Sequence, residues 1–244
     1  MASPATSAPY CGSAPLPGDI WQRWNGDPLL LLLFAAALVT GAAWLGGDRR
    51  SKLAWNGGLA ALLIAFVSPL CALSSGLFAA RSAHHLLVVA LAAPLLGFAL
   101  AGRCGRLPVA LLAAAHILAF WAWHVPGLYA AALANDLFYW LMQTTLLGTG
   151  LLFWAALYKG GRAVAEIAAL LAMIVQMGLL GAIITFAPTA MYAPHFDTAH
   201  LYGVTPLADQ QVAGLIMWVG SLPLTLAAGA PLLLRRLSAR LAPA

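Results

Sequence analysis

Charged side chains are scarce in this chain, making up 8% of its 244 residues against 63% hydrophobic residues. A soluble domain carries about 25% charged residues. So little charge excludes an ordinary soluble domain and indicates an integral membrane protein, with its core built in lipid. The twelve basic residues outnumber the seven acidic ones. They fall between apolar runs and form no basic stripe, so the composition does not indicate a nucleic-acid partner.

Cysteine is also scarce. Cys11, Cys71 and Cys104 are too few for a disulfide framework, and whether Cys11 and Cys71 pair stays open. The N-terminus lacks a basic stretch followed by an apolar core, so no cleavable signal peptide is predicted. No Ser/His/Asp arrangement, glycine-rich phosphate loop or pair of carboxylates stands in a catalytic pattern. The sequence therefore predicts no enzyme chemistry.

Long apolar runs are abundant. Residues 1–27, rich in Pro, Gly, Ser and Ala, are predicted to be a disordered periplasmic tail up to about Ile20-Trp21. Each of the seven runs that follow is near the ~20 residues that a bilayer requires. They predict an all-α polytopic membrane protein with a seven-helix domain at 28–236 and a cytoplasmic tail at 237–244. Pro223 and Pro231 predict that the last run tilts, kinks or leaves the bilayer early. The runs are 28–46, 53–73, 83–101, 107–123, 137–158, 163–187 and 207–234.

The basic residues alternate between the two sides of this arrangement. One side receives ten of them and the other receives only Arg23 and Arg81. Lys and Arg stay cytoplasmic, so the N-terminus is predicted outside and the C-terminus inside. The ten are Arg49, Arg50, Lys52, Arg103, Arg106, Lys159, Arg162, Arg235, Arg236 and Arg240.

This topology places five of the six histidines at the outer face. An outer-face histidine can be an ordinary interfacial residue, but five together favour a site. His124 follows Trp123 at the end of the fourth run, where a histidine can titrate or bind a metal. The others are His84 and His85, which open the third run, and His195 and His200, which lie with Asp197 in the long outer loop.

Helical geometry restricts which histidines can act together. His84 and His85 point about 100° apart, so both cannot face one metal, and we favour His85. His116 and His124 are separated by roughly 12 Å along the helix axis and cannot chelate one ion together. His116 is expected to be a buried histidine bonded to a backbone carbonyl. An ionisable residue in mid-membrane is nevertheless also a functional candidate.

The sequence also places soft ligands near the outer face, and these indicate copper as the metal. Met142 lies just inside the outer face, and Cys71 is also outer. Thioether, thiol and imidazole together select copper, Cu(I) above all. Met173 and Met177 have helical spacing that is more often simple packing. The candidate metal ligands are His85, His124, Met142, Cys71, His84 and His116.

The seventh run carries a face of small and polar residues. Gln210, Gly214, Met217 and Ser221 recur at helical spacing and predict a seam where helices approach closely. Asp209 is expected to cap the start of this helix and to orient the outer rim of the site.

Several segments resemble the CtaG-type cytochrome c oxidase assembly factors, a family of seven-span bacterial membrane proteins. The most specific is Leu201 to Trp218, with its D-Q-Q-x-A-G-x-x-M-W pattern. The resemblance covers about residues 65–220. It implies a role in maturing the copper centre of a haem-copper oxidase, with oxidase subunits and periplasmic copper chaperones as partners. The other segments are Ser68-Pro-Leu, His85-Leu-Leu with Ala93-Pro-Leu-Leu, Trp123-His-Val-Pro-Gly-Leu-Tyr129 and Gly150-Leu-Leu-Phe-Trp154.

The chain departs from the family pattern at several candidate ligands. Cys71 stands where the family tends to have aspartate, and Arg81 replaces the first histidine of H-M-x-x-H, whereas His85 keeps the second. In the fifth run, Tyr139, Met142 and Gln143 stand in the pattern H-x-x-E-H. The chain thus resembles a divergent branch, with three candidate ligands lost and one soft residue gained.

Three functional hypotheses follow. The first is an oxidase assembly factor that holds or passes Cu(I) through His85, His124, Met142 and Cys71. The second is a metal-free scaffold whose apolar surface holds an oxidase subunit during insertion into the membrane. The third is a copper transporter or haem-binding electron carrier, supported only by His116.

Overall fold

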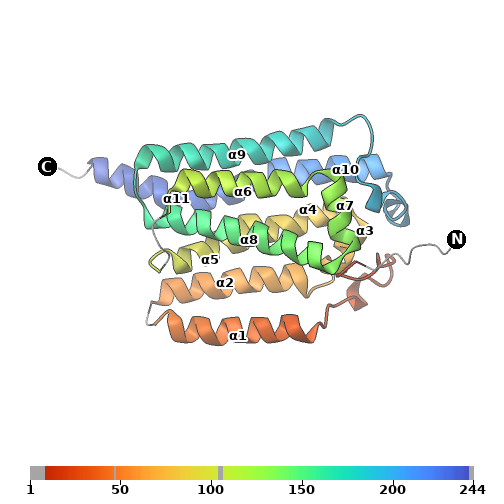
Figure 1. The fold of residues 1–244 in the computed structure, drawn as a ribbon, viewed down its shortest axis with the longest axis horizontal. Coiled ribbons are helices and arrows are strands. Elements are labelled where there is room, and N and C mark those ends of the chain that lie inside the picture. The colour runs from red at the N-terminus through yellow and green to blue at the C-terminus, as the bar shows by residue number, and fades with distance from the viewer. Residues whose placement is uncertain (1–8, 47, 104–106, 242–244) are drawn as a thin grey trace.

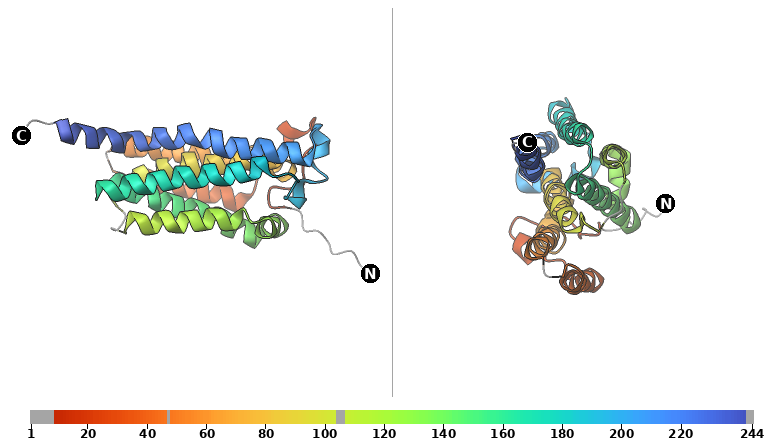
Figure 2. Two further views of the ribbon diagram at one scale, coloured as in Figure 1. Left: turned by 90° about the horizontal axis from the view of Figure 1, so that it is seen from above. Right: turned by 90° about the vertical axis from the view of Figure 1, so that its left-hand side faces the viewer.

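The computed structural model describes residues 9–46, 48–103 and 107–241, and this part of the chain is helical, with no strand. The helices run side by side along the long axis of the molecule (Figure 1). α1 lies at the edge of the bundle in the end-on view (Figure 2, right). The helices are α1 (Pro28–Trp44), α2 (Arg49–Phe66), α3 (Leu70–Gly76), α4 (Phe78–Leu86), α5 (Ala93–Leu100), α6 (Val109–Trp123), α7 (Pro126–Ala134), α8 (Asp136–Lys159), α9 (Ala163–Phe186), α10 (Pro206–Leu215) and α11 (Ser221–Leu241).

Four helical stretches are long and apolar enough to cross a bilayer: Phe78–Leu100, Asp136–Lys159, Ala163–Phe186 and Pro206–Ala230. Two bent pairs, α2 with α3 at 46° and α6 with α7 at 77°, raise the number to six if each pair is one span. α1 is apolar but shorter. The structure thus supports an all-helical membrane protein, whereas seven spans and the orientation of the two ends stay predictions.

Two of the long stretches contain wide π-helical turns. η2 (Leu87–Ala92) joins α4 to α5 just before Pro94, and η5 (Ile216–Gly220) joins α10 to α11 just before Pro223. A proline ring collides with the carbonyl four residues earlier in a regular α-helix. A wider turn provides room for the ring, so both helices continue.

The two ends of the bundle differ in chemistry. α3, α7 and the loop between α9 and α10 lie at one end, which carries a disulfide and is here called the disulfide end (Figure 1). The opposite end carries basic residues: Arg49 and Arg50 begin α2, Lys159 ends α8 and Arg162 precedes α9. This separation is what the topology prediction requires. Residues 104–106, which include Cys104 and Arg106, lie outside the described residues.

The N-terminal segment, residues 9–27, is folded against the disulfide end, which differs from the disordered tail expected there. Cys11 forms a disulfide with Cys71 of α3. Asn25 donates from its backbone to the Val67 carbonyl over 2.9 Å and from its side chain to the Phe66 carbonyl over 3.1 Å. These bonds join the segment to the end of α2. Residues 1–8 of the predicted tail lie outside the described residues.

Candidate functional site

α4 carries the main polar side chains of the bundle interior. Arg81 and His84 are fully buried, and His85 is only 4% exposed. The helix begins at Phe78 because the Asp209 carboxylate accepts hydrogen bonds from Phe78 N (2.7 Å) and Ala79 N (3.0 Å). A carboxylate at a helix N-terminus satisfies amides that have no partner within the helix. Asp209 thereby fixes where the polar face of α4 starts.

Asp209 does not cap its own helix, contrary to the sequence expectation. α10 begins at Pro206, and the Thr205 side chain caps it by accepting from Ala208 N over 3.1 Å. Asp209 lies one turn inside α10 and reaches across to α4. A local cap is recognisable in a sequence, whereas a cap between helices depends on the packing.

Arg81 is the centre of the polar cluster on α4. None of its three guanidinium nitrogens has a hydrogen-bond partner. The guanidinium lies over the Tyr139 ring, 5.4 Å from the centroid. The phenol oxygens of Tyr129 and Tyr139 both lie close enough to interact with the Arg81 guanidinium, although neither is in good hydrogen-bond geometry with it. Arg81 was counted as a loop charge in the topology prediction; it lies instead inside the bundle, one turn into α4.

Three histidine rings form a row beside Arg81. The centroids of His84 and His85 are 5.7 Å apart, and those of His85 and His124 are 5.9 Å apart. His124 Nδ1 bonds to the Phe120 carbonyl over 2.7 Å. Such a bond fixes the tautomer and leaves Nε2 as the acceptor nitrogen. Both nitrogens of His84 and Nε2 of His85 have no hydrogen-bond partner.

The fit of this site to a metal is limited to a pair of ligands. Among the described residues, no group of three or more His, Cys, Asp or Glu is placed to hold a metal ion. Met142 is fully buried on the inner face of α8. Cys71 was a predicted ligand, but its sulfur is bonded to Cys11 and is not free in this form. The ring centroids of His85 and His124 lie 5.9 Å apart, so these two imidazoles could share an ion.

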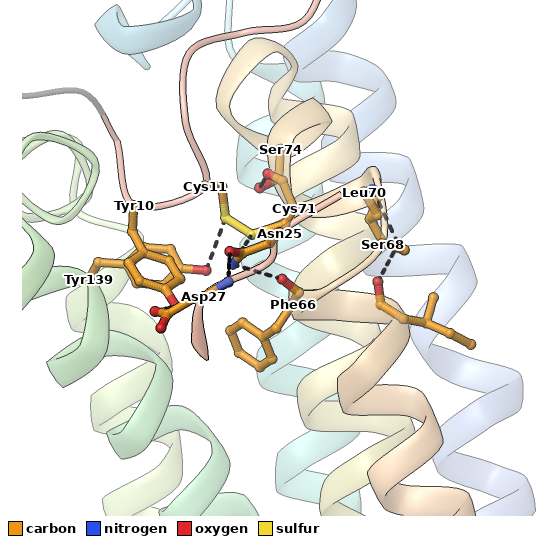
Figure 3. The surroundings of a disulfide bond; sticks show 11 residues. Tyr10, Cys11, Asn25, Asp27, Phe66, Ser68, Leu70, Cys71, Ser74 and Tyr139 are labelled. Carbon is orange, nitrogen blue, oxygen red and sulfur yellow. Dashed lines mark hydrogen bonds between the residues drawn. A yellow bond between two sulfur atoms is a disulfide. The ribbon is translucent and has the colours of Figure 1, made fainter. Parts of the chain in front are cut away.

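The disulfide lies beside the rings of Tyr10 and Tyr139 (Figure 3). Tyr10 stacks on Tyr139 with centroids 4.9 Å apart, and Cys11 Sγ lies 3.3 Å from the Tyr139 hydroxyl. The Tyr10 hydroxyl donates to Asp27 over 2.5 Å, which holds the pKa of that carboxyl below its usual range. The N-terminal segment therefore covers Tyr139, which in turn covers Arg81.

Replacing both Cys11 and Cys71 by serine is expected to release this segment. The cross-link closes a loop with a sequence separation of 60, which stabilises the folded state by on the order of 4 kcal/mol. Arg23 is exposed within the segment. Trypsin should cleave after Arg23 roughly tenfold faster or more in the variant. Wild type treated with a thiol reductant is the matched sample, and equal cleavage in all forms would contradict a restraining role.

His195 reaches the cluster from the loop between α9 and α10. Its Nε2 lies 2.6 Å from the Tyr129 hydroxyl, and the Gly76 backbone carbonyl lies near the ring, although Nδ1 makes no hydrogen bond of good geometry. Burial, with a smaller contribution from the nearby Arg81 charge, lowers the pKa of His195 to about 3. His195 is therefore neutral at physiological pH. Asp197 and His200 in the same loop are exposed.

His116 lies apart from the row of histidines. It is buried, and its Nδ1 lies 2.7 Å from the Thr149 hydroxyl of α8. The partner is a threonine hydroxyl and not the backbone carbonyl expected from the sequence. This bond joins α6 to α8 and favours a structural role for His116.

The polar residues at the start of the last span join elements together. The Gln210 side chain accepts from Met191 N over 2.6 Å and donates to the carbonyls of Ile184 and Thr189. These bonds position the segment that leaves α9. Trp123 donates to the Thr145 hydroxyl over 2.9 Å. Met217 is buried in η5, and Gly214 packs on the α9 backbone, so this face is a packing seam.

Sequence reasoning missed the central place of Arg81 and the role of the tyrosines around it. Arg81, His84 and His85 are spaced by three and four residues, which places them on one side of a helix. That spacing was a usable signal. Gln143 is also buried with both amide atoms lacking a hydrogen-bond partner, and only the structure shows this.

A family model described as the cytochrome c oxidase caa3 assembly factor matches residues 31–239. The chain belongs to this family. No curated protein and no solved structure matches the chain. Membership in the caa3 assembly factor family implies association with cytochrome c oxidase and suggests a role that is not catalytic.

Proposed function

We propose that this caa3 assembly factor supports maturation of the oxidase copper centre, at the periplasmic face of a bacterial plasma membrane. The disulfide end faces the periplasm in this proposal. Disulfides persist in oxidising compartments, which favours that orientation. The basic residues at the opposite end favour the cytoplasm there. Two independent chemical features thus favour the same orientation.

The pair of His85 and His124 is the observation that carries a copper role. With metal–nitrogen bonds of about 2 Å, two imidazoles that face one ion have ring centroids roughly 6 Å apart. The observed separation is 5.9 Å. The bond from His124 Nδ1 to the Phe120 carbonyl is the kind of support that orients a metal-binding imidazole. Copper bound there would be Cu(I) held by few ligands, which suits transfer to oxidase subunits or exchange with periplasmic copper chaperones.

The second candidate is a metal-free scaffold that holds an oxidase subunit during insertion. Arg81 favours it, because a buried positive charge beside His84 and His85 opposes a metal cation. The disulfide favours it as well, since it removes the Cys71 thiol. The two candidates differ in whether the purified protein binds copper.

Cu(I) titration against a chromophoric chelator tests the copper role. Wild type should bind Cu(I), and His124→Ala should weaken binding by about 100-fold, the scale seen when a ligand or its support is lost. Met142→Leu tests whether the thioether contributes to the site. His200→Ala removes an exposed histidine of the same end and should leave the affinity unchanged. Cys71→Ser should also leave it unchanged if the disulfide form is the one that binds.

The opposite result supports the scaffold. If wild type binds no copper, and a deletion strain still loses assembled oxidase when copper is abundant, the metal-free role is correct. If the deletion strain assembles a copper-replete oxidase under copper limitation, both roles are contradicted.

A further inference from the structure

The Arg81 guanidinium is a buried charge that makes no hydrogen bond of good geometry to any described residue. Its exposed fraction is 0%, and no acceptor lies in hydrogen-bond geometry with any of its nitrogens. Isolating a charge from water costs several kcal/mol unless an opposite charge and hydrogen bonds compensate it. The surroundings of Arg81 do not supply that compensation.

The Asp209 carboxylate at the start of α4 makes no hydrogen bond to Arg81. Asp209 accepts from the backbone of Phe78 and Ala79, so its oxygens serve the start of α4. The Tyr139 ring supplies a cation–π contact at 5.4 Å, and the phenol oxygens of Tyr129 and Tyr139 lie near the guanidinium. Both phenols are neutral, so they do not cancel the Arg81 charge. Arg81 is therefore fixed in place but not neutralised.

Other groups with free hydrogen-bonding capacity surround it. His84 and His85 follow on the same helix, and His195 comes from the loop between α9 and α10; the Arg81 charge acts on all three. Both ring nitrogens of His84, Nε2 of His85 and the Ser82 hydroxyl are buried without a hydrogen-bond partner. A neutral imidazole donates from one nitrogen, and a serine hydroxyl also donates. The cluster is thus rich in donors, with a permanent positive charge among them.

We propose that Arg81, with His84, His85 and His195 around it, binds an oxyanion inside the disulfide end of the bundle. A planar guanidinium matches the oxygens of a phosphate or carboxylate in a bidentate arrangement. The oxyanion neutralises the charge that the protein leaves uncompensated. The N-terminal segment, which covers Tyr139 by stacking Tyr10 on it, closes the site. Arg81, His84 and His195 take no part in the proposed copper pair, and only His85 is common to the two sites.

Inorganic phosphate is the probe. The full chain, stripped of lipid in an uncharged detergent, should bind radiolabelled phosphate in a saturable way and unfold at a higher temperature when phosphate is present. Arg81→Met should abolish both effects. In phosphate-free buffer Arg81→Met should be at least as stable as wild type, because it removes an uncompensated charge. If Arg81 only stabilised the fold, Arg81→Met would be less stable than wild type in phosphate-free buffer.

Two further variants complete the test. Arg23→Gln removes an exposed positive charge from the same end and should keep phosphate binding. Arg81→Lys keeps the positive charge but lacks the planar guanidinium group, so it should weaken phosphate binding by about tenfold. If Arg81→Met does not fold, the Arg81→Lys variant tests whether Arg81 binds phosphate. Equal phosphate effects in wild type and both Arg81 variants, or no saturable binding to wild type, would overturn the proposal.

The same measurement in nanodiscs identifies the source of the oxyanion. If phosphate binds equally in phosphatidylcholine discs with and without phosphatidylglycerol, the ligand is a free anion. If phosphatidylglycerol displaces phosphate from wild type, the ligand is a lipid headgroup. Either result supports an oxyanion site at Arg81.

Discussion

Asp209→Ala is expected to lower the free energy of unfolding by about 3 kcal/mol, because it leaves one buried and one part-buried amide without an acceptor. The carboxylate accepts from Phe78 N and Ala79 N and is only 3% exposed. These bonds join α10 to the start of α4, which carries Arg81, His84 and His85. We therefore expect the variant to lose the local order of the polar cluster as well as stability. Unfolding by SDS titration in mixed micelles measures the change in the free energy of unfolding.

Two variants control for a general loss of helix capping. Asp209→Asn keeps one acceptor oxygen and should lose about half as much stability. Thr205→Ala removes the exposed cap of α10 itself and should cost about 1 kcal/mol. If Asp209→Ala cost no more than Thr205→Ala, the bonds between the helices would contribute little, and the placement of α4 would need another explanation.

Gly214→Ala is expected to destabilise the seam between α9 and α10 by about 3 kcal/mol, the upper part of the range for overpacking. A β-carbon at Gly214 would lie 2.6 Å from the Gly181 carbonyl oxygen and 2.7 Å from Thr185 N. Both are backbone atoms and cannot rotate away. The helices would have to separate, and the Gln210 bonds to the segment after α9 would weaken with them. Thermal unfolding in detergent and the amount of assembled oxidase in the membrane both measure this.

Gly148→Ala is the matched control. Gly148 lies within α8, and a β-carbon there would meet no atom within 4 Å. The same substitution should stabilise the protein by roughly 0.5–1 kcal/mol, because glycine loses more conformational freedom in a helix. Equal behaviour of the two variants would show that α9 and α10 can separate without cost.

The helices and the clustering of polar groups could be predicted from the sequence. The seven apolar runs lie largely on helix in the described residues, since runs of about 20 apolar residues have one stable form in lipid, but the second run, 53–73, is broken between α2 and α3. The one-sided placement of His84, His85, His124 and His195 also follows from where those runs end. The break at Pro126 is predictable because proline cannot continue the hydrogen-bond ladder.

The contacts between helices were decided only by the tertiary structure. Whether Asp209 caps its own helix or α4, and whether Cys71 is free or bonded to Cys11, depends on residues more than 50 positions apart. Arg81 reads as a loop charge in the sequence, yet packing buries it under Tyr139. Local pattern determines which segments become helices, because backbone hydrogen bonds are satisfied within each one. The partner of each polar side chain is determined by which helix lies opposite it, and a pattern along one segment holds no information on that.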